Sequence, residues 1–347
     1  MPTLPGVSVA LGTYNGERFL QQQLDSLAGQ RVRPAELVAC DDCSSDGTLA
    51  ILESFAGRAP FPVTIVQNES NLGFTANLIG AAERCEGPLI AFCDQDDVWL
   101  EDKIECCAQF FADHSVRLLL HAAQPVDENL RPLGKPFPSV SRTTVAPAQA
   151  ADPWLFAPGF ALVLDRSLLG LADWRRRPPS RDLHGQPMDF DEWFYFLAWA
   201  TGEIGFVDRC LVLYRQHGTN TFGAPAGGWA RHVRKLLDED FATQVGRTAT
   251  ARAYAAFLDE QSHVWAADDP ELADRLARAE RRWRAYEELA RRRDGLYAAP
   301  TSGARLSRFW RLLMSAAYRA RASGGLGSRA LARDVRELVL PGRGAGT

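Results

Sequence analysis

Residues 88–99 read PLIAFCDQDDVW, and this stretch decides how the rest of the chain is interpreted. Its first six residues form an apolar run with the length of a buried strand. Three carboxylates then follow within four residues, at Asp94, Asp96 and Asp97. Like charges this close destabilise a fold unless a cation lies among them. The stretch therefore predicts a buried strand that ends in a cation-binding turn, and an exposed acidic turn is the alternative.

Three similar apolar runs precede this strand, and a helical pattern separates each run from the next. The expected strands and helices alternate along the chain as 7–11, 17–28, 37–40, 48–55, 63–66, 75–84 and 88–93. Such alternation predicts an α/β fold, in which a doubly wound, mostly parallel sheet is covered by helices on both faces. Ligands of such sheets bind beyond the carboxyl ends of the strands.

Beyond these elements the pattern is less regular. Residues 131–153 are rich in Pro, Ser, Thr and Ala, which predicts a loop. Further strands are expected at 160–164, 204–207 and 211–214, and an aromatic-rich helix at 192–201. After about residue 223 the composition shifts to Ala, Arg and Leu with helical spacing. We therefore expect an α/β domain over 1–224 and a helical, basic region over 225–347.

Composition excludes several classes of protein. The chain has 347 residues, 46% of them hydrophobic and 24% charged, which is typical of soluble globular proteins and not of disordered or collagen-like chains. No run of about 18 apolar residues predicts a membrane-spanning helix, and the first residues do not resemble a secretory signal. Seven cysteines in a chain of this size favour reduced thiols. We therefore expect a cytoplasmic protein.

Charge is distributed unevenly between the two expected regions. Residues 1–224 hold 17 basic and 28 acidic side chains, whereas 225–347 hold 22 basic and 15 acidic ones. The acidic front region favours metal binding over nucleic-acid binding. The basic tail favours an anionic surface, such as the cytoplasmic leaflet of a membrane.

Polar residues also follow the other expected strands. Gly12 and Tyr14 lie in a turn that would let the chain approach a flat base, although a plain turn before a helix explains them equally well. Asp41 and Asp42 are adjacent acids at a strand tip, where they are either solvated or paired with donors. Chain segments that follow later contribute the acids Asp189, Asp191 and Glu192 at a helix start, and then Arg215 and His217 after a strand. One of these acids could serve as a general base, or the helix dipole could simply stabilise acids at this position.

Two common nucleotide-binding motifs are absent. The chain contains neither GxGxxG nor GxxxxGK[ST], which argues against a dinucleotide-binding domain and a P-loop NTPase. The sequence CDDC at 40–43 has no second Cys or His pair at zinc spacing.

Taken together, these motifs resemble those of family 2 glycosyltransferases of the GT-A fold, most of all bacterial rhamnosyltransferase-type enzymes of surface-polysaccharide synthesis. The resemblance covers about residues 7–222. It rests on four blocks in order: TYNGERFLQQQLDSL, CDDCSSDGT, NLGFTANLIGAAERCEGPLIAFCDQDDVW and LYRQHGTNT.

The resemblance implies a role for each matching residue. Asp191 would be the catalytic base, with Asp189 and Glu192 as alternatives, because Phe190 departs from the His that the family often has at that position. Gly159, Phe160 and Trp193 would lie on the acceptor side. The residues that would bind Mg²⁺ or Mn²⁺ are Asp94, Asp96, Asp97 and His217. The nucleoside-diphosphate sugar would contact Gly12, Tyr14, Asp41, Asp42, Asn71, Gly73, Asn77, Asp94 and Arg215.

The implied reaction is inverting transfer of a sugar to a saccharide or a lipid-linked saccharide. The resemblance favours dTDP-rhamnose as the donor and leaves a UDP-hexose open. A sugar nucleotidyltransferase is one rival, but the turn after the first strand is poor in Lys and Gly. A non-catalytic nucleotide-sugar-binding scaffold is another, and the retained acids argue against it.

The tail suggests a further contact. Residues 304–322 (ARLSRFWRLLMSAAYRARA) would place Leu306, Phe309, Trp310, Leu313 and Ala317 on one side of a helix with flanking arginines. Such a helix can lie in a membrane interface, and the alternative is a helix packed on the core. We therefore expect peripheral contact with the inner face of the cell membrane as one interpretation.

Overall fold

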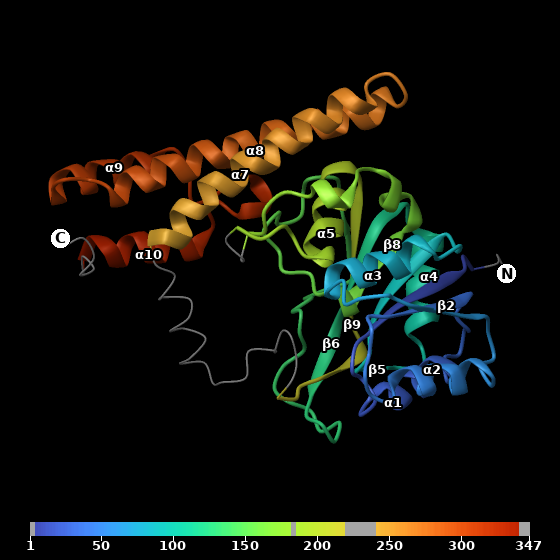
Figure 1. Cartoon of the computed structure of the whole chain (residues 1–347). Helices are drawn as coiled ribbons and strands as arrows, with labels where there is room; N and C mark the ends of the chain where they lie inside the picture. The colour runs from blue at the N-terminus through green and yellow to red at the C-terminus, as the bar shows by residue number, and fades with distance from the viewer. Residues whose placement is uncertain (1–3, 182–184, 219–240, 340–347) are drawn as a thin grey trace. The chain divides into compact units, whose positions relative to one another are not determined.

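The computed structural model describes residues 4–181, 185–218 and 241–339. The chain divides into two compact units (Figure 1). The sheet unit comprises 1–148, 156–176 and 189–224, and the helical unit comprises 149–155, 177–188 and 225–347. Residues 149–155 and 177–188 thus belong to the helical unit, whereas the prediction of a single boundary assigned them to the first domain. The predicted boundary at 225 itself lies outside the described residues.

A mixed sheet forms the core of the sheet unit. Its strands run in the order β3-β2-β1-β4-β8-β6-β9-β5, and β7 pairs with β9. The first four strands are mutually parallel, and β8 runs antiparallel to both of its neighbours. The bounds are β1 Val7–Thr13, β2 Glu36–Asp41, β3 Val63–Gln67, β4 Leu89–Asp94, β5 Val98–Trp99, β6 Val116–Val126, β7 Thr144–Ala146, β8 Leu162–Asp165 and β9 Glu203–Arg215.

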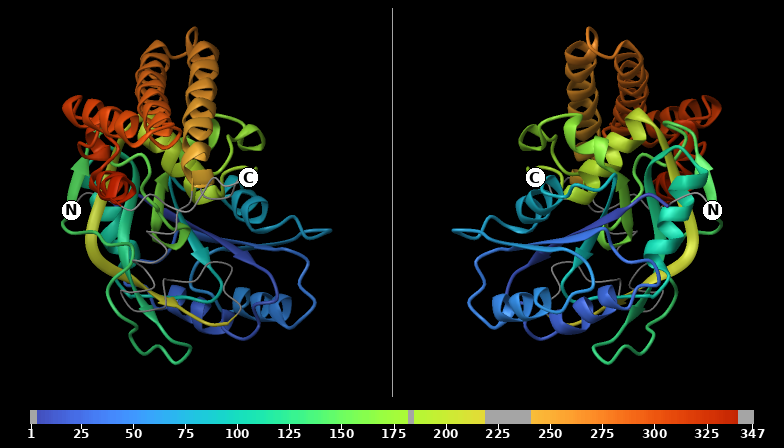
Figure 2. Two further views of the ribbon diagram at one scale, coloured as in Figure 1. Left: turned by 90° about the vertical axis from the view of Figure 1, so that its left-hand side faces the viewer. Right: turned by 90° about the vertical axis from the view of Figure 1, so that its right-hand side faces the viewer.

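Helices cover both faces of this sheet, as the sequence predicts. Helices α1 and α2 lie on one face, and α3 and α5 lie on the other (Figure 2). Nearly every residue of α5 is buried, which explains why the part of its sequence after Glu192, WFYFLAWA, is apolar on all sides. The bounds are α1 Leu20–Ala28, α2 Thr48–Ala56, α3 Phe74–Glu83, α4 Lys103–Asp113 and α5 Phe190–Thr201.

The predicted α/β architecture is confirmed, with corrections in its second half. The four parallel strands and three helices over the first 94 residues occur where expected. The expected loop over 131–153 contains the short strand β7, and the two strands expected at 204–207 and 211–214 are one continuous strand, β9. Register shifts in the pairing of β9 with β6 let this long strand stay paired across the polar residues between its apolar runs.

The pairing register sets the carboxyl ends of three strands at one level. Gly12 of β1 pairs with Cys40 of β2 on one side and with Asp94 of β4 on the other. Thr13 pairs in turn with Asp41. The turns that follow these strands therefore meet at one edge of the sheet, the place where ligands of parallel sheets bind.

The helical unit is built around an antiparallel pair, α7 (Phe241–Trp265) and α8 (Pro270–Tyr297), followed by α9 (Ser302–Met314) and α10 (Ser328–Val339). The expected helix over 304–322 is too long, because α9 ends at Met314 and the chain turns before a short 3-10 segment at Arg321–Ser323. The expected single apolar side also divides, since Phe309 and Ala317 are buried whereas Leu306 and Trp310 are exposed. None of the described helices is long and apolar enough to cross a membrane.

Candidate active site

The turn after β1 is tied to the turn after β4. The backbone N–H of Tyr14 donates to Gln95 Oε1 (2.9 Å), and Gln95 Nε2 donates back to the carbonyl of Tyr14 (3.0 Å). The ring of Tyr14 is half exposed beside this bridge. Position 12, at the end of β1, requires a glycine, because a Cβ there would lie 2.9 Å from Leu78 of α3. The first strand thus ends in a fixed turn with an open aromatic ring.

The two acids at the end of β2 organise the surrounding loops. Asp41 is fully buried and accepts hydrogen bonds from the Thr13 hydroxyl and from the Ser44 N–H and hydroxyl. Asp42 accepts from Asn68 Nδ2 (2.9 Å) and from the backbone N–H groups of Leu72 (2.7 Å) and Gly73 (2.9 Å). Asp41 is therefore a framework residue here, which differs from the donor contact expected of it. Asp42 holds the 71–73 loop, and its contact with a base stays a prediction.

The loop before α3 follows from these bonds. Gly73 has a φ of +84°, a conformation that favours glycine, and its N–H is fixed by Asp42. Asn71 donates to the Asp42 carbonyl (3.3 Å). Asn77 is buried and donates to the Cys40 carbonyl (2.8 Å). Asn77 is thus placed to join β2 to α3, whereas Asn71 and Gly73 lie at the surface of the site.

The acids after β4 occupy three different environments. Asp94 is partly exposed, and its Oδ1 is buried with no hydrogen-bond partner. Asp96 lies beside His217, with Oδ2 and Nε2 2.8 Å apart. Asp97 is fully buried; its Oδ1 accepts from the Arg215 N–H (2.9 Å), and its Oδ2 has no partner. Burial, reinforced by the Asp96 and Asp191 carboxylates, raises the pKa of Asp94 to about 7. Burial likewise raises the pKa of Asp97 well above its usual range.

The expected four-residue metal site requires a correction. Among the described residues, no group of three or more His, Cys, Asp or Glu side chains is arranged to hold a metal ion. The physical reason is that Asp97 is buried away from solvent and His217 is already paired with Asp96. Asp94 and Asp96 are the accessible acids, and Mg²⁺ commonly binds one or two carboxylates together with substrate phosphates. The unpartnered Asp94 oxygen fits a divalent ion that arrives with a diphosphate.

The predicted base lies near this acid. Asp191 opens helix α5 and is partly exposed, and its carboxylate is close enough to raise the pKa of Asp94. Asp189 is also partly exposed and accepts from the Thr75 hydroxyl of α3 (3.2 Å), whereas Glu192 is largely buried. Asp191 itself accepts from the Glu192 N–H (2.7 Å). Burial therefore disfavours Glu192, and the choice of Asp191 over Asp189 stays a prediction.

The acceptor-side residues form packing around α5. Gly159 lies against the ring of Phe190, where a Cβ would come within 2.1 Å of the ring. Phe160 is buried and stacks on Tyr214 (centroids 4.2 Å apart), and Trp193 is only 1% exposed. The buried side chains of Phe160 and Trp193 thus shape the wall of the site and do not face solvent, in contrast to the expected direct contact.

Arg215 also differs from its expected role. Its side chain is buried and donates to the carbonyls of Asp96 (2.7 Å) and Glu128 (2.6 Å) and to Gln22 Oε1 (2.6 Å). The guanidinium is therefore directed at the backbone of the acidic turn and not outward at a phosphate. We interpret Arg215 as a residue that positions the acidic turn.

Sequence reasoning missed a buried cation behind the acids. Lys103, the first residue of α4, is fully buried; its Nζ donates to the Phe160 carbonyl (2.8 Å) and lies 3.6 Å from the centre of the Trp99 ring. Burial lowers the pKa of Lys103 to about 8, while nearby thiols and then Asp97 and Asp94 oppose that shift. A lysine nine residues after Asp94 in a helical pattern gives no sequence signal of burial.

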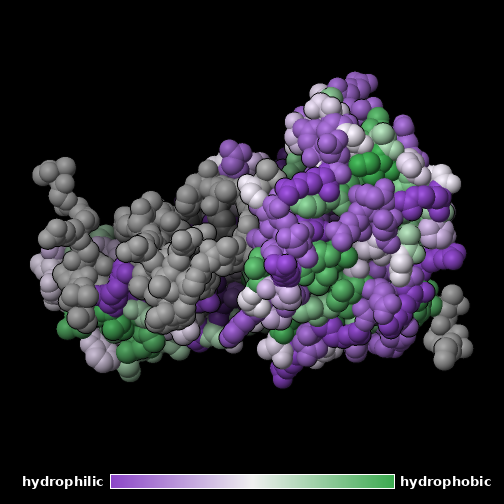
Figure 3. Space-filling view, turned by 90° about the horizontal axis from the view of Figure 1, so that it is seen from below, coloured by the Kyte–Doolittle hydropathy of each residue, from purple (hydrophilic) through white to green (hydrophobic). Residues whose placement is uncertain are grey.

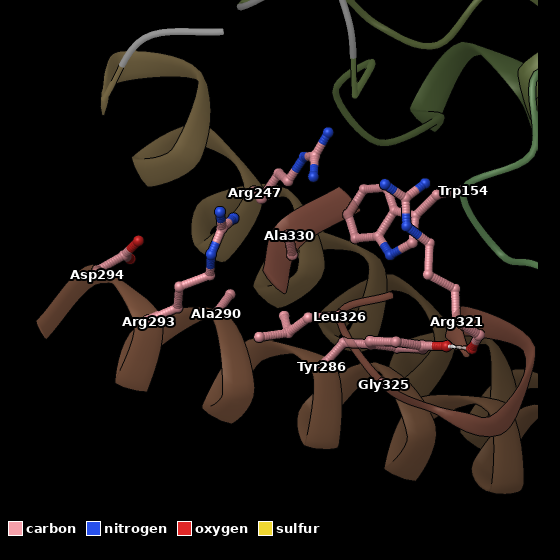
Figure 4. Close-up of a pocket in the computed structure, with 10 residues that line it drawn as sticks. All are labelled: Trp154, Arg247, Tyr286, Ala290, Arg293, Asp294, Arg321, Gly325, Leu326 and Ala330. Carbon is pink, nitrogen blue, oxygen red and sulfur yellow. Dashed lines mark hydrogen bonds between the residues drawn. The ribbon is translucent and has the colours of Figure 1, made fainter. Parts of the chain in front are cut away.

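A pocket in the helical unit offers a second candidate (Figure 4). Three arginines line it beside the rings of Trp154 and Tyr286. Arg293 is bound to the buried carboxylate of Asp334, and Arg321 lies 3.8 Å from Asp152. Because much of its positive charge is already balanced by carboxylates, this pocket is a weaker candidate than the sheet edge.

Comparisons with known proteins agree with the geometry. The family model for glycosyl transferase family 2 matches residues 8–169. Putative glycosyltransferase EpsE of Bacillus subtilis is 34% identical over 110 residues, which cover 32% of this chain and 40% of that protein. The dTDP-rhamnosyl transferase RfbG of Shigella flexneri is 26% identical over 264 residues, covering 72% of this chain and 87% of that protein.

Some of the other matches cover only part of the related protein, and the match to a solved structure shows the fold alone. The match with the uncharacterized protein Rv1520 of Mycobacterium tuberculosis covers 59% of that protein, so the chain spans about half the length of several curated relatives. The crystal structure of S. aureus TarS 1-349 in complex with UDP-GlcNAc has a TM-score of 0.53 and 18% identity, covering 91% of this chain and 93% of that chain. The expected GT-A architecture is thereby confirmed, and residues 8–169 of this chain match the model of glycosyl transferase family 2.

Proposed function

We propose that the protein transfers a sugar from a nucleoside-diphosphate donor to a saccharide acceptor in the synthesis of a surface polysaccharide. The observation that carries this proposal is that two acids lie near each other at the carboxyl edge of the sheet. They are Asp94, which has an oxygen without a hydrogen-bond partner, and Asp191. The match to the family model, the dTDP-rhamnosyl transferase RfbG and the TarS structure in complex with UDP-GlcNAc support the substrate class.

Each part of the edge has a role in this proposal. Tyr14 and the loop that Asp42 holds would bind the nucleoside, with Asn71 and Gly73 bordering the sugar. Asp94 and Asp96 would hold Mg²⁺ or Mn²⁺ on the donor diphosphate. When bound, such an ion offsets negative charge on the leaving diphosphate.

Asp191 would act as the general base. Its carboxylate would accept the proton of the acceptor hydroxyl as that oxygen attacks the anomeric carbon of the sugar. The bond to the diphosphate breaks as the new glycosidic bond forms, and a single displacement inverts the anomeric configuration. The buried rings of Phe160, Phe190 and Trp193 would keep α5, and with it Asp191, in place.

The donor is proposed by chemistry and by likeness. The similarity to RfbG favours dTDP-rhamnose, and the TarS structure with UDP-GlcNAc keeps a UDP-hexose as the second candidate. The acceptor we propose is a saccharide, free or linked to a lipid.

The test is a thermal-shift panel of dTDP-, UDP- and GDP-sugars with and without Mn²⁺, followed by assay of donor turnover. A bound donor raises the melting temperature by mass action. We expect a shift with dTDP- or UDP-sugars that requires Mn²⁺ and is lost in Asp96→Ala. Binding with no turnover, with or without saccharide acceptors, would support a scaffold, and release of pyrophosphate from a nucleoside triphosphate would support a nucleotidyltransferase.

A further inference from the structure

Helix α9 of the helical unit carries large apolar side chains on its outer side as well as its inner side. Phe309 and Leu312 are buried in a cluster with Leu296 and Ala317. Leu306, Trp310 and Met314 are 48%, 53% and 80% exposed. Residues four apart share a helix face, so these three side chains form one row, which we call the outer row.

The outer row is a feature that folding does not explain. The cluster of Phe309 and Leu312 already holds α9 in the unit, so three further large apolar residues add little to its stability. Apolar residues also reach the surface of the helical unit in the space-filling view (Figure 3). A row with an exposed tryptophan is typical of surfaces that bind a partner or a membrane interface.

The segment that carries the outer row is rich in positive charge, which favours one kind of partner. From Gly295 to Arg333 the chain contains seven arginines and no acidic residue. Arg311 lies next to Trp310 in the sequence and is exposed, as are Arg319 and Arg329 in the segments that follow. Arginines around an apolar row fit a surface that is apolar below and anionic above, which is the chemistry of a bilayer with anionic lipids.

A second copy of this chain fits less well. In a symmetric dimer the same patch faces itself, so the arginines of one copy would approach those of the other. Like charges across an interface oppose association. An anionic bilayer meets both the apolar row and the positive charge.

We propose that the outer row of α9 (Leu306, Trp310 and Met314) inserts into the interface of a membrane that contains anionic lipids. The row lies in the plane of the membrane, with the rings and methyl groups at the level of the headgroups and the arginines on lipid phosphates. This inference rests on the helical unit alone and does not depend on the proposed transfer activity.

The test is flotation of the full chain with vesicles of phosphatidylcholine and phosphatidylglycerol, against vesicles of phosphatidylcholine alone. We expect the wild type to float with the anionic vesicles only, and to be released by high salt, because salt screens the arginines. In the triple variant Leu306→Gln, Trp310→Gln, Met314→Gln, the fraction of protein bound to the vesicles should fall at least about tenfold. The control is Val264→Gln, which changes an apolar residue of α7 that is 59% exposed and should float like the wild type.

Two results would overturn the proposal. One is equal flotation of the triple variant and the wild type. The other is a wild type that stays with neither vesicle but is a dimer in solution that the triple variant loses, which would assign the row to self-association. Circular dichroism and the melting temperature check folding of the triple variant, and both should be unchanged since the three side chains are exposed.

Discussion

The sheet unit and the helical unit both bury carboxylates, but the buried carboxylates differ in their hydrogen-bond partners. In the helical unit, Asp334 is fully buried and receives hydrogen bonds from Arg293, Tyr297 and Tyr318. In the sheet unit, Asp94 and Asp97 each keep a buried oxygen with no partner among the described residues.

The difference separates a structural site from a functional one. A buried carboxylate whose hydrogen bonds are all made stabilises one arrangement of the chain around it. A buried carboxylate without a partner carries a desolvation cost that a ligand can remove. The acids of the sheet edge are therefore the ones to examine for binding, and the acid of the helical unit for stability.

The largest expected effect is on turnover. Asp191→Asn keeps the shape of the side chain but cannot accept the acceptor proton, so kcat should fall by about 10²–10⁴-fold. Donor affinity, measured by calorimetry, should stay near that of the wild type, because the diphosphate is held elsewhere. Near-normal kcat in this variant would move the base to Asp189 or Glu192.

Next in size is a loss of stability in the helical unit. Asp334→Ala leaves Arg293 buried without its partner, and breaking such a pair costs about 3–5 kcal/mol. Urea unfolding should show this loss, while Asp259→Ala, at an exposed acid of the same unit, should unfold like the wild type. A loss below about 1 kcal/mol would show that the network is not the structural site described here.

A smaller effect is expected from the buried cation of the sheet unit. Lys103→Met removes the charge that faces Asp94 and Asp97 and leaves the Phe160 carbonyl without its donor, which should cost about 1–3 kcal/mol. If Lys103 balances these acids, Mn²⁺ should raise the melting temperature of the variant more than that of the wild type. Equal Mn²⁺ shifts in the two proteins would limit Lys103 to its hydrogen bond.

The last effect is a dependence of stability on pH. Burial raises the pKa of Asp94 to about 7 in the folded state, so the folded protein binds more protons than the unfolded one between about pH 4 and pH 7. The free energy of unfolding of the wild type, measured with EDTA, should therefore fall relative to Asp94→Asn as the pH rises across this range. A difference that is flat with pH would mean that Asp94 is well solvated.

The sequence predicts the early part of the fold well, because alternating strands and helices with strong periodicity leave one simple arrangement. It misses β6 and the antiparallel course of β8, since a strand's direction depends on partners that are far away in the chain. The four blocks contain the turns that the pairing register brings to one edge of the sheet, and ligand binding at that edge stays a prediction.

The roles of individual side chains are harder to predict. Arg215 and Trp193 have the chemistry of ligand contacts, but both are buried by packing that only the folded chain reveals. Lys103 escapes notice for the opposite reason, because a lysine at a helix start is usually exposed. Burial therefore decides which of several similar residues meets a ligand.

The most direct test of the account is calorimetric titration of UDP and dTDP into the wild type, with and without Mn²⁺. The same titration is made with Asp94→Asn and with Glu53→Gln, which alters an exposed acid on α2. We predict Mn²⁺-dependent binding of at least one nucleotide to the wild type and to Glu53→Gln, and its loss in Asp94→Asn. Equal binding by Asp94→Asn and the wild type would contradict the claim that Asp94, the partly exposed acid with an unpartnered oxygen, belongs to the ligand site.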